Sequence, residues 1–103
     1  MQFSRFRFIT FTVTIAEPGV FSSTGHELIE DDTVQLETTG ALPTGLLVDT
    51  TYYVIRNGIA ADSFQLSTSM GGDAITTSGS QSGTHQYIKT NRARLIPNVE
   101  NNK

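Results

Sequence analysis

Hydrophobic and polar residues alternate with a period of two along several short stretches of the chain. The first stretch is the clearest, and three threonines alternate there with Ile9, Phe11, Val13 and Ile15. A period of two puts alternate side chains on opposite faces of a strand, so this pattern predicts a β-strand with one apolar face. Glu17-Pro18-Gly19 follows and ends the strand, because proline lacks a backbone donor and glycine permits a tight turn.

Further stretches predict strands of the same kind. They span residues 34–37, 51–56, 63–67 and 85–89, and residues 74–77 form a shorter candidate. The stretch 51–56 (TYYVIR) combines aromatic and β-branched residues, which favour strands, and Asn57-Gly58 follows it as a turn signal. No helical period is present. The pattern therefore predicts an all-β fold, a single small antiparallel β-sandwich or barrel with extended N- and C-terminal arms.

Both ends of the chain differ from the middle. Phe6 and Phe8 fall in the phase opposite to Ile9, which predicts a bulge or a strand that leaves the sheet. After Thr90 the chain is polar apart from a few apolar residues. We therefore divide the chain into an N-terminal arm (1–9), a β-module (10–90) and a C-terminal arm (91–103). The edge strands of such a module are expected to expose unpaired donors and acceptors.

Composition and charge narrow the function. A chain of 103 residues suits one domain, and the absence of cysteine excludes disulfides and a thiol nucleophile. The net charge of −3 argues against nucleic-acid binding, and no apolar run is long enough to span a membrane. Residues 16–88 carry nine carboxylates and one arginine, whereas 1–15 carry +2 and 89–103 carry +3. This asymmetry is interpreted first as solvated basic termini, and basic ends that contact an acidic neighbour are the alternative.

No motif assembles a catalytic or metal site. His26 and His85 lack metal-ligand spacing and are interpreted as surface or turn residues. Residues 30–32 (EDD) lack the ligand order of a calcium loop and are interpreted as a solvated turn. Residues 79–83 (GSQSG) have glutamine where a nucleophile elbow needs serine. We therefore expect no enzyme, no catalytic residue, no cofactor and no metal.

Two adjacent tyrosines are a further candidate site. Strand alternation directs one of Tyr52 and Tyr53 inward and the other outward. An outward tyrosine beside Arg56 is suited to stacking on a sugar or filling a partner's pocket. Packing within the sheet is the alternative interpretation of the same pair.

Six short motifs follow one another in a characteristic order. They are Thr24-Gly25-His26, residues 39–46 (TGALPTGL), 51–55 (TYYVI), 63–67 (SFQLS), Gly71-Gly72 and Gly83-Thr84-His85. This series resembles a recurrent β-module of tailed-bacteriophage virion proteins, over about residues 10–88. The module occurs in tail, fibre and capsid-associated proteins. It is likened to the first catalytic-cysteine half-domain of ubiquitin-activating enzymes, in shape only, because this chain has no cysteine. Glu27 and Asp31 depart from the family pattern, which has glycine at both positions.

The resemblance implies a structural protein of the virion. Within that class we expect a capsid decoration (cement) protein on the capsid surface, which clamps neighbouring capsid subunits. The expected partners are the major capsid protein or other virion subunits, and a homo-oligomer is expected, with a trimer favoured. The candidate contact residues are Arg5, Phe6, Arg7 and Phe8 in the N-terminal arm and Arg92, Arg94, Leu95 and Ile96 in the C-terminal arm. The alternatives are a tail or fibre component and a host-glycan-binding module acting through Tyr52 or Tyr53.

Overall fold

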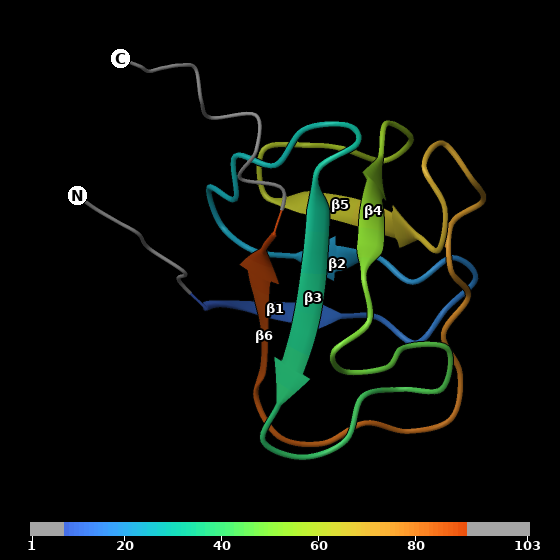
Figure 1. The fold of residues 1–103 in the computed structure, drawn as a ribbon. Coiled ribbons are helices and arrows are strands. Elements are labelled where there is room, and N and C mark those ends of the chain that lie inside the picture. The colour runs from blue at the N-terminus through green and yellow to red at the C-terminus, as the bar shows by residue number, and fades with distance from the viewer. Residues whose placement is uncertain (1–7, 91–103) are drawn as a thin grey trace.

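The computed structural model describes residues 8–90, which form an all-β fold (Figure 1). Its strands are β1 (Ile9–Val13), β2 (Phe21–Ser22), β3 (Thr33–Thr38), β4 (Tyr52–Ile55), β5 (Ser63–Ser67) and β6 (His85–Lys89). The predicted fold class is confirmed. Ile9 belongs to β1, where it pairs with Tyr87, so the barrel begins one residue before the predicted boundary of the N-terminal arm.

The strands close into an antiparallel barrel in the order β1-β2-β5-β4-β3-β6. Closure depends on β1, which pairs with β6 over Ile9–Phe11 and then with β2 at Thr12 and Val13. Because β6 also pairs with β3, the ladder returns to its starting strand. Each described strand therefore has a hydrogen-bonded neighbour on both sides along part of its length, and the expectation of wholly unpaired edge strands is wrong for this part of the chain.

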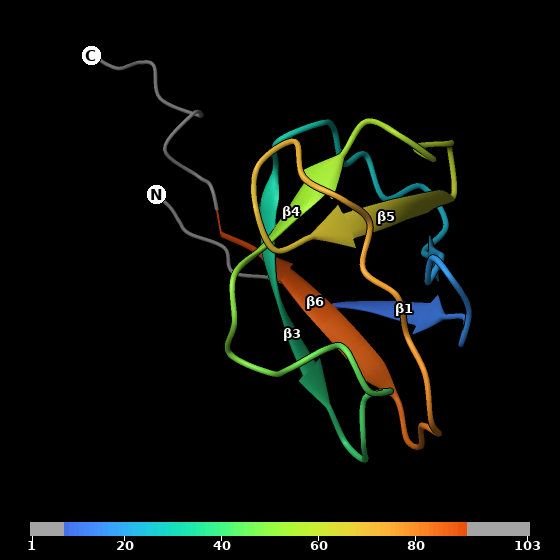
Figure 2. The same cartoon turned by 90° about the vertical axis from the view of Figure 1, so that its right-hand side faces the viewer.

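Two short segments differ from the sequence-based expectation. Phe21 and Ser22 form a strand that the pattern did not indicate, because two residues are too few to show a period. Residues 74–77 form no strand. They cross from β5 to the β1–β2 connection: Ile75 N–H donates to Leu66 O at 2.9 Å, and Thr77 N–H donates to Ala16 O at 3.0 Å. In Figure 2 this segment runs down the near side of the barrel toward the start of β6.

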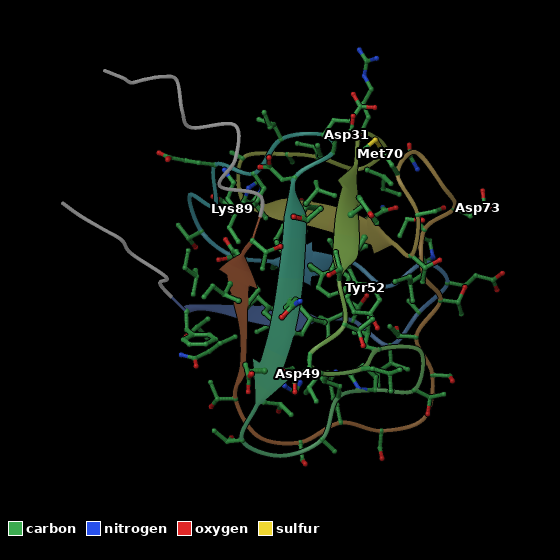
Figure 3. All side chains as sticks on the ribbon, in the orientation of Figure 1. Asp31, Asp49, Tyr52, Met70, Asp73 and Lys89 are labelled. Carbon is green, nitrogen blue, oxygen red and sulfur yellow. The ribbon has the colours of Figure 1, made fainter. Side chains whose placement is uncertain are left out.

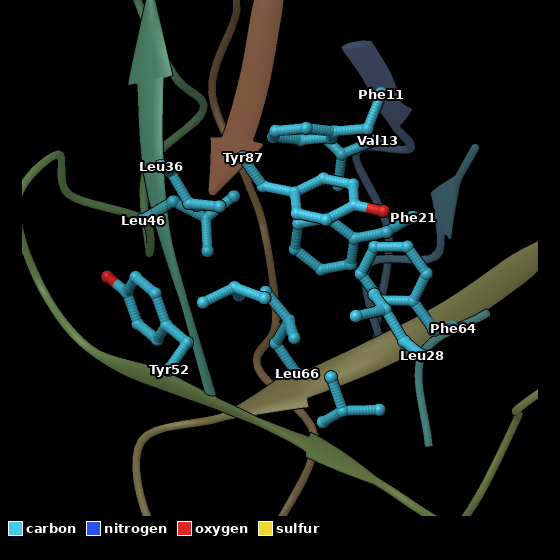
Figure 4. Packing of buried hydrophobic residues seen from close by; sticks show 12 residues of the cluster. Phe11, Val13, Phe21, Leu28, Leu36, Leu46, Tyr52, Phe64, Leu66 and Tyr87 are labelled. Atoms are coloured by element: carbon cyan, nitrogen blue, oxygen red, sulfur yellow. The ribbon is translucent and has the colours of Figure 1, made fainter. Parts of the chain in front are cut away.

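The core contains the apolar faces that the alternation predicted for β1, β3 and β5, together with residues that it did not predict, such as Phe21. Phe11, Phe21, Phe64 and Tyr87 form a chain of ring contacts, with Phe21 stacked on Phe64 at 5.4 Å between ring centroids (Figure 4). Each buried ring removes on the order of 150–250 Å² from water, so this cluster dominates the hydrophobic stabilisation. Ile15, predicted on the same face, is exposed because β1 ends at Val13.

The predicted turn after the strongest strand is confirmed. Ile59 N–H donates to Arg56 O at 3.2 Å, which closes a turn around Asn57 and Gly58. Gly58 has a φ of +85°, a value that suits glycine and strains residues with a Cβ atom. The turn therefore needs glycine at this position.

Candidate functional site

The two described ends of the chain lie next to each other. Ile9 of β1 pairs with Tyr87 of β6, and the two strands are antiparallel. The chain therefore enters the barrel at Phe8 and leaves it at Thr90 on neighbouring strands (Figures 1 and 2). We call this end of the barrel the exit end. The N- and C-terminal arms both begin there.

An ion pair between a buried carboxylate and a partly exposed lysine stabilises the exit end. Lys89 Nζ lies 3.4 Å from Asp32 Oδ2, and the Asp32 side chain is 0% exposed whereas that of Lys89 is 39% exposed. The same oxygen accepts a hydrogen bond from Ile29 N–H at 3.0 Å. Figure 3 shows Lys89 at the C-terminal end of β6. Buried carboxylates need such partners. The interpretation of residues 30–32 as a fully solvated turn is therefore wrong for Asp32, although Asp31 is exposed.

The ladder between β3 and β6 continues one residue beyond β6. Thr90 N–H donates to Thr33 O at 2.9 Å, and the two threonine hydroxyls are hydrogen-bonded at 2.8 Å. Thr90 is thus held in line with β6, because both its backbone and its side chain are fixed to β3. The C-terminal arm starts from a defined position and direction.

Near the exit end, neighbouring strands carry side chains that point outward and lie next to one another. Ile88 lies opposite Gln35 of β3. The register of β1 with β6, continued by one residue, brings Phe8 beside Ile88. Phe8 is 51% exposed, and Ile88 is partly buried. We define the exit face as the outer surface formed by Phe8, Ile88, Gln35 and Tyr53.

The two tyrosines point to opposite sides, as alternation predicted. Tyr52 is 1% exposed, and its hydroxyl accepts a hydrogen bond from Leu47 N–H at 2.8 Å. Its ring is in the core (Figure 4) and cannot contact an outside partner, so Tyr52 is no longer a candidate contact residue.

Tyr53 lies opposite Thr33 and is partly buried on the outer side. Arg56 is exposed just after β4, at the exit end. The structure thus brings Phe8, Tyr53 and Arg56 to one end.

The remaining predicted contacts lie outside the described residues. They are Arg5, Phe6 and Arg7 in the N-terminal arm and Arg92, Arg94, Leu95 and Ile96 in the C-terminal arm. Their positions in the chain still place them directly before Phe8 and directly after Thr90.

Charge separates the barrel from its arms. Residues 16–88 carry nine carboxylates and one arginine, a net charge of −8. Glu30 and Asp31 are exposed in the turn that leads into β3, at the exit end. Two arginines precede Phe8 and two follow Thr90. Basic segments therefore start from the acidic body close to its exposed carboxylates.

No family model, curated protein or solved structure matches the chain. Among residues 8–90, no cluster of three or more His, Asp or Glu side chains is placed to hold a metal ion. The same residues contain no helix of the length and apolar character that crossing a membrane requires.

The buried His85 side chain is the centre of a hydrogen-bond network at the end of the barrel opposite the exit end. Gln81 Nε2 donates to Val13 O at 2.8 Å, which directs the Gln81 Oε1 atom toward His85 Nε2 at 2.9 Å. His85 Nε2–H therefore donates, and Nδ1 accepts from the Thr38 hydroxyl at 2.8 Å. Burial lowers the pKa of His85 from its usual 6.5, so the ring is neutral near pH 7. The sequence analysis did not identify Gln81, because a polar residue in a loop rich in serine and glycine gives no periodic signal of a buried hydrogen bond.

His26 is also buried, with its ring edge against Phe64. Its Nε2–H donates to Ala60 O at 2.8 Å and to Ser63 O at 2.9 Å. Its Nδ1 accepts from Leu28 N–H at 2.8 Å. The interpretation of the two histidines as surface or turn residues is wrong as to exposure, because both rings are buried. The His26 ring satisfies backbone groups, whereas the His85 ring satisfies the side chains of Gln81 and Thr38.

Two open grooves follow β1, one on each side, with volumes of about 400 and 340 Å³. They lie where β1 lacks a neighbouring strand. In one groove the Ser23 hydroxyl donates to Thr10 O at 3.0 Å, and in the other the Gln81 side chain donates to Val13 O. These side chains already donate hydrogen bonds to the β1 carbonyl oxygens that an added partner strand would have to pair with. The exit end, rather than the grooves, is therefore the stronger candidate for partner binding.

Proposed function

We propose that the protein is a structural component of a tailed-phage virion, a decoration protein that clamps neighbouring capsid subunits at the capsid surface. It acts by binding, without catalysis or cofactor, and it contacts neither nucleic acid nor membrane. Its partners are the major capsid protein or other virion subunits, and it assembles as a homo-oligomer, with a trimer favoured.

The observation that carries this proposal is the position of the two points at which the arms join the barrel. These points, Phe8 and Thr90, lie on adjacent strands at the exit end, as the pairing of Ile9 with Tyr87 requires. A clamp needs two attachment segments held at a fixed spacing by a body that does not deform. A closed barrel supplies such a body, because its strands are paired on both sides.

Charge and apolar surface support the same role. The arms carry four arginines in the candidate segments, and arginine is well suited to bidentate contacts with carboxylates on a neighbouring subunit. Phe8, 51% exposed at the root of the N-terminal arm, supplies an aromatic anchor. The glycan-binding alternative has weaker support, since Tyr52 is buried. A tail or fibre component would use the same contacts, and locating the protein on the particle distinguishes this alternative from a capsid position.

Truncation of the C-terminal arm tests the clamp. The full chain and a variant lacking residues 91–103 are each mixed with capsids assembled without the protein, and the bound fraction is measured by co-sedimentation. We expect the full chain to sediment with the capsids and the truncated chain to remain in the supernatant.

A fold control accompanies this experiment. Urea unfolding followed by circular dichroism should give both chains one cooperative transition with similar midpoints, because the last strand ends at Lys89. Replacement of Asn101 and Asn102 by alanine serves as the matched control, and it should leave capsid binding unchanged. Undiminished binding of the truncated chain would remove the proposed role of the C-terminal arm.

A further inference from the structure

We infer that the C-terminal arm of one copy docks on the exit face of a second copy, so that the protein assembles by exchanging arms. The inference rests on the proposed function, which assumes that the arms bind neighbouring subunits. It adds that one of the subunits bound by the C-terminal arm is another copy of this chain.

The direction of the chain at Thr90 favours a second copy over the arm's own barrel. Thr90 is held to Thr33 by a backbone hydrogen bond of 2.9 Å and a hydroxyl hydrogen bond of 2.8 Å, in line with β6. The ion pair of Lys89 with buried Asp32 holds the residue before it. The chain at Thr90 is therefore directed off the end of the barrel, whereas Ile88 and Gln35 of its own exit face lie behind it.

The sequence after Thr90 disfavours a reversal. Residues 91–94 (NRAR) contain one turn-forming residue, Asn91, and neither glycine nor proline. Tight turns are built mainly from glycine, proline, asparagine, aspartate and serine. A fully extended chain advances about 3.3 Å per residue, so five residues reach at most roughly 17 Å from Thr90 and thirteen residues at most about 43 Å. That reach suits a neighbouring barrel.

The chemistry of the arm matches the exit face. Residues 95–97 (LIP) are its main apolar stretch, and Phe8 and Ile88 form an apolar strip on the exit face. Two arginines precede this stretch. On the receiving copy, the exposed carboxylates Glu30 and Asp31 lie at the same end as the strip. The arm and the receiving end therefore carry complementary groups, with arginines for the exposed carboxylates and an apolar stretch for the apolar side chains.

Two single-cysteine variants test the exchange on the purified chain, which has no native cysteine. Leu95→Cys and Ile88→Cys chains, one carrying a size tag, are mixed in a glutathione buffer, and disulfide-linked pairs are separated by mass. We expect the mixed Leu95→Cys/Ile88→Cys pair in excess over both homodimers. Replacement of Ile88→Cys by Ser80→Cys, an exposed loop position, should abolish that excess.

The oligomeric state gives an independent readout. Sedimentation equilibrium should show an assembly of several 11.2 kDa chains for the full protein and a single chain after deletion of residues 91–103. A monomeric full chain, or an internal disulfide in a Leu95→Cys, Ile88→Cys double variant with no mixed pair, would overturn the exchange. Capsid binding is measured separately by co-sedimentation, so failure of the exchange is distinguishable from failure of the capsid clamp, although a monomeric full chain would also contradict the proposed homo-oligomer.

Discussion

At the scale of single residues, the polar groups inside the barrel decide its local structure. His26 and His85 each use both ring nitrogens to satisfy backbone or side-chain partners, and Gln81 links β6 to the carbonyl of Val13. Buried polar groups remain in a core only when they are hydrogen-bonded. None of these contacts has a sequence signature, because each joins residues that lie far apart in the chain or in an irregular loop.

The lowered pKa of His85 predicts a pH dependence of stability. The unfolded chain binds a proton at this residue near pH 6.5, whereas the folded chain binds it only at lower pH. The unfolded state therefore holds more protons between these two values, and the free energy of unfolding falls as the pH drops from 6.5 through that window. Urea unfolding at about pH 7.5 and about pH 5.5 should show a larger loss for the native chain than for His85→Gln. Equal losses would contradict the assignment.

The ion pair at the exit end predicts unequal effects of its two partners. Lys89→Met deprives the fully buried Asp32 carboxylate of its lysine and should destabilise the barrel by about 2 kcal/mol, less than a fully buried pair because Lys89 is partly solvated. Asp32→Asn keeps an acceptor for Ile29 N–H and leaves a lysine that can reach water, so its effect should be smaller. The free energy of unfolding in urea measures both.

The matched control for this pair is Asp31→Asn. Asp31 is exposed and has a φ of +74°, a conformation that asparagine also tolerates. Its substitution should change stability by less than about 0.5 kcal/mol. An Asp32→Asn effect as large as that of Lys89→Met would show that the buried charge is not the cause.

At the scale of elements, the sequence pattern predicted five of the six strands and the apolar faces of β1, β3 and β5. The pairs Phe11 and Val13, and Phe64 and Leu66, are buried as their period requires. The pattern could not show closure, because β2 has only two residues and the partner of a strand is not encoded in its own period. For the same reason, the proximity of the two arms emerged only from the pairing of β1 with β6.

The irregular segment 74–77 is expected to stabilise the barrel by hydrogen-bonding to the backbone just after β1. The Thr77 hydroxyl donates to Thr14 O at 2.6 Å and accepts from Ala16 N–H at 3.0 Å. Thr77→Val keeps the shape but removes both bonds, and it should cost about 1–2 kcal/mol of stability in urea unfolding. The neighbouring Thr76 is exposed, so Thr76→Val should be nearly neutral. Equal stability of the two variants would refute this stabilising role.

At the scale of the whole molecule, the proposed clamp combines an acidic barrel with basic arms. Electrostatic contacts between exposed groups weaken as salt screens them over about 10 Å at 0.1 M. Capsid binding of the full chain should therefore weaken as the salt concentration rises, and Arg92→Ala, Arg94→Ala chains should show a smaller dependence. Co-sedimentation across a salt series measures this. A salt-independent interaction would place the binding energy in apolar contacts such as Phe8.

A cryo-electron-microscopy difference map tests whether the protein clamps capsid subunits through its exit end. Particles that carry the protein are compared with particles assembled without it. We expect barrel-sized extra density on the outer capsid shell, with its exit end toward the shell and connected density reaching adjacent subunits. Extra density confined to the tail or a fibre, or a barrel on the capsid attached by its opposite end, would contradict it.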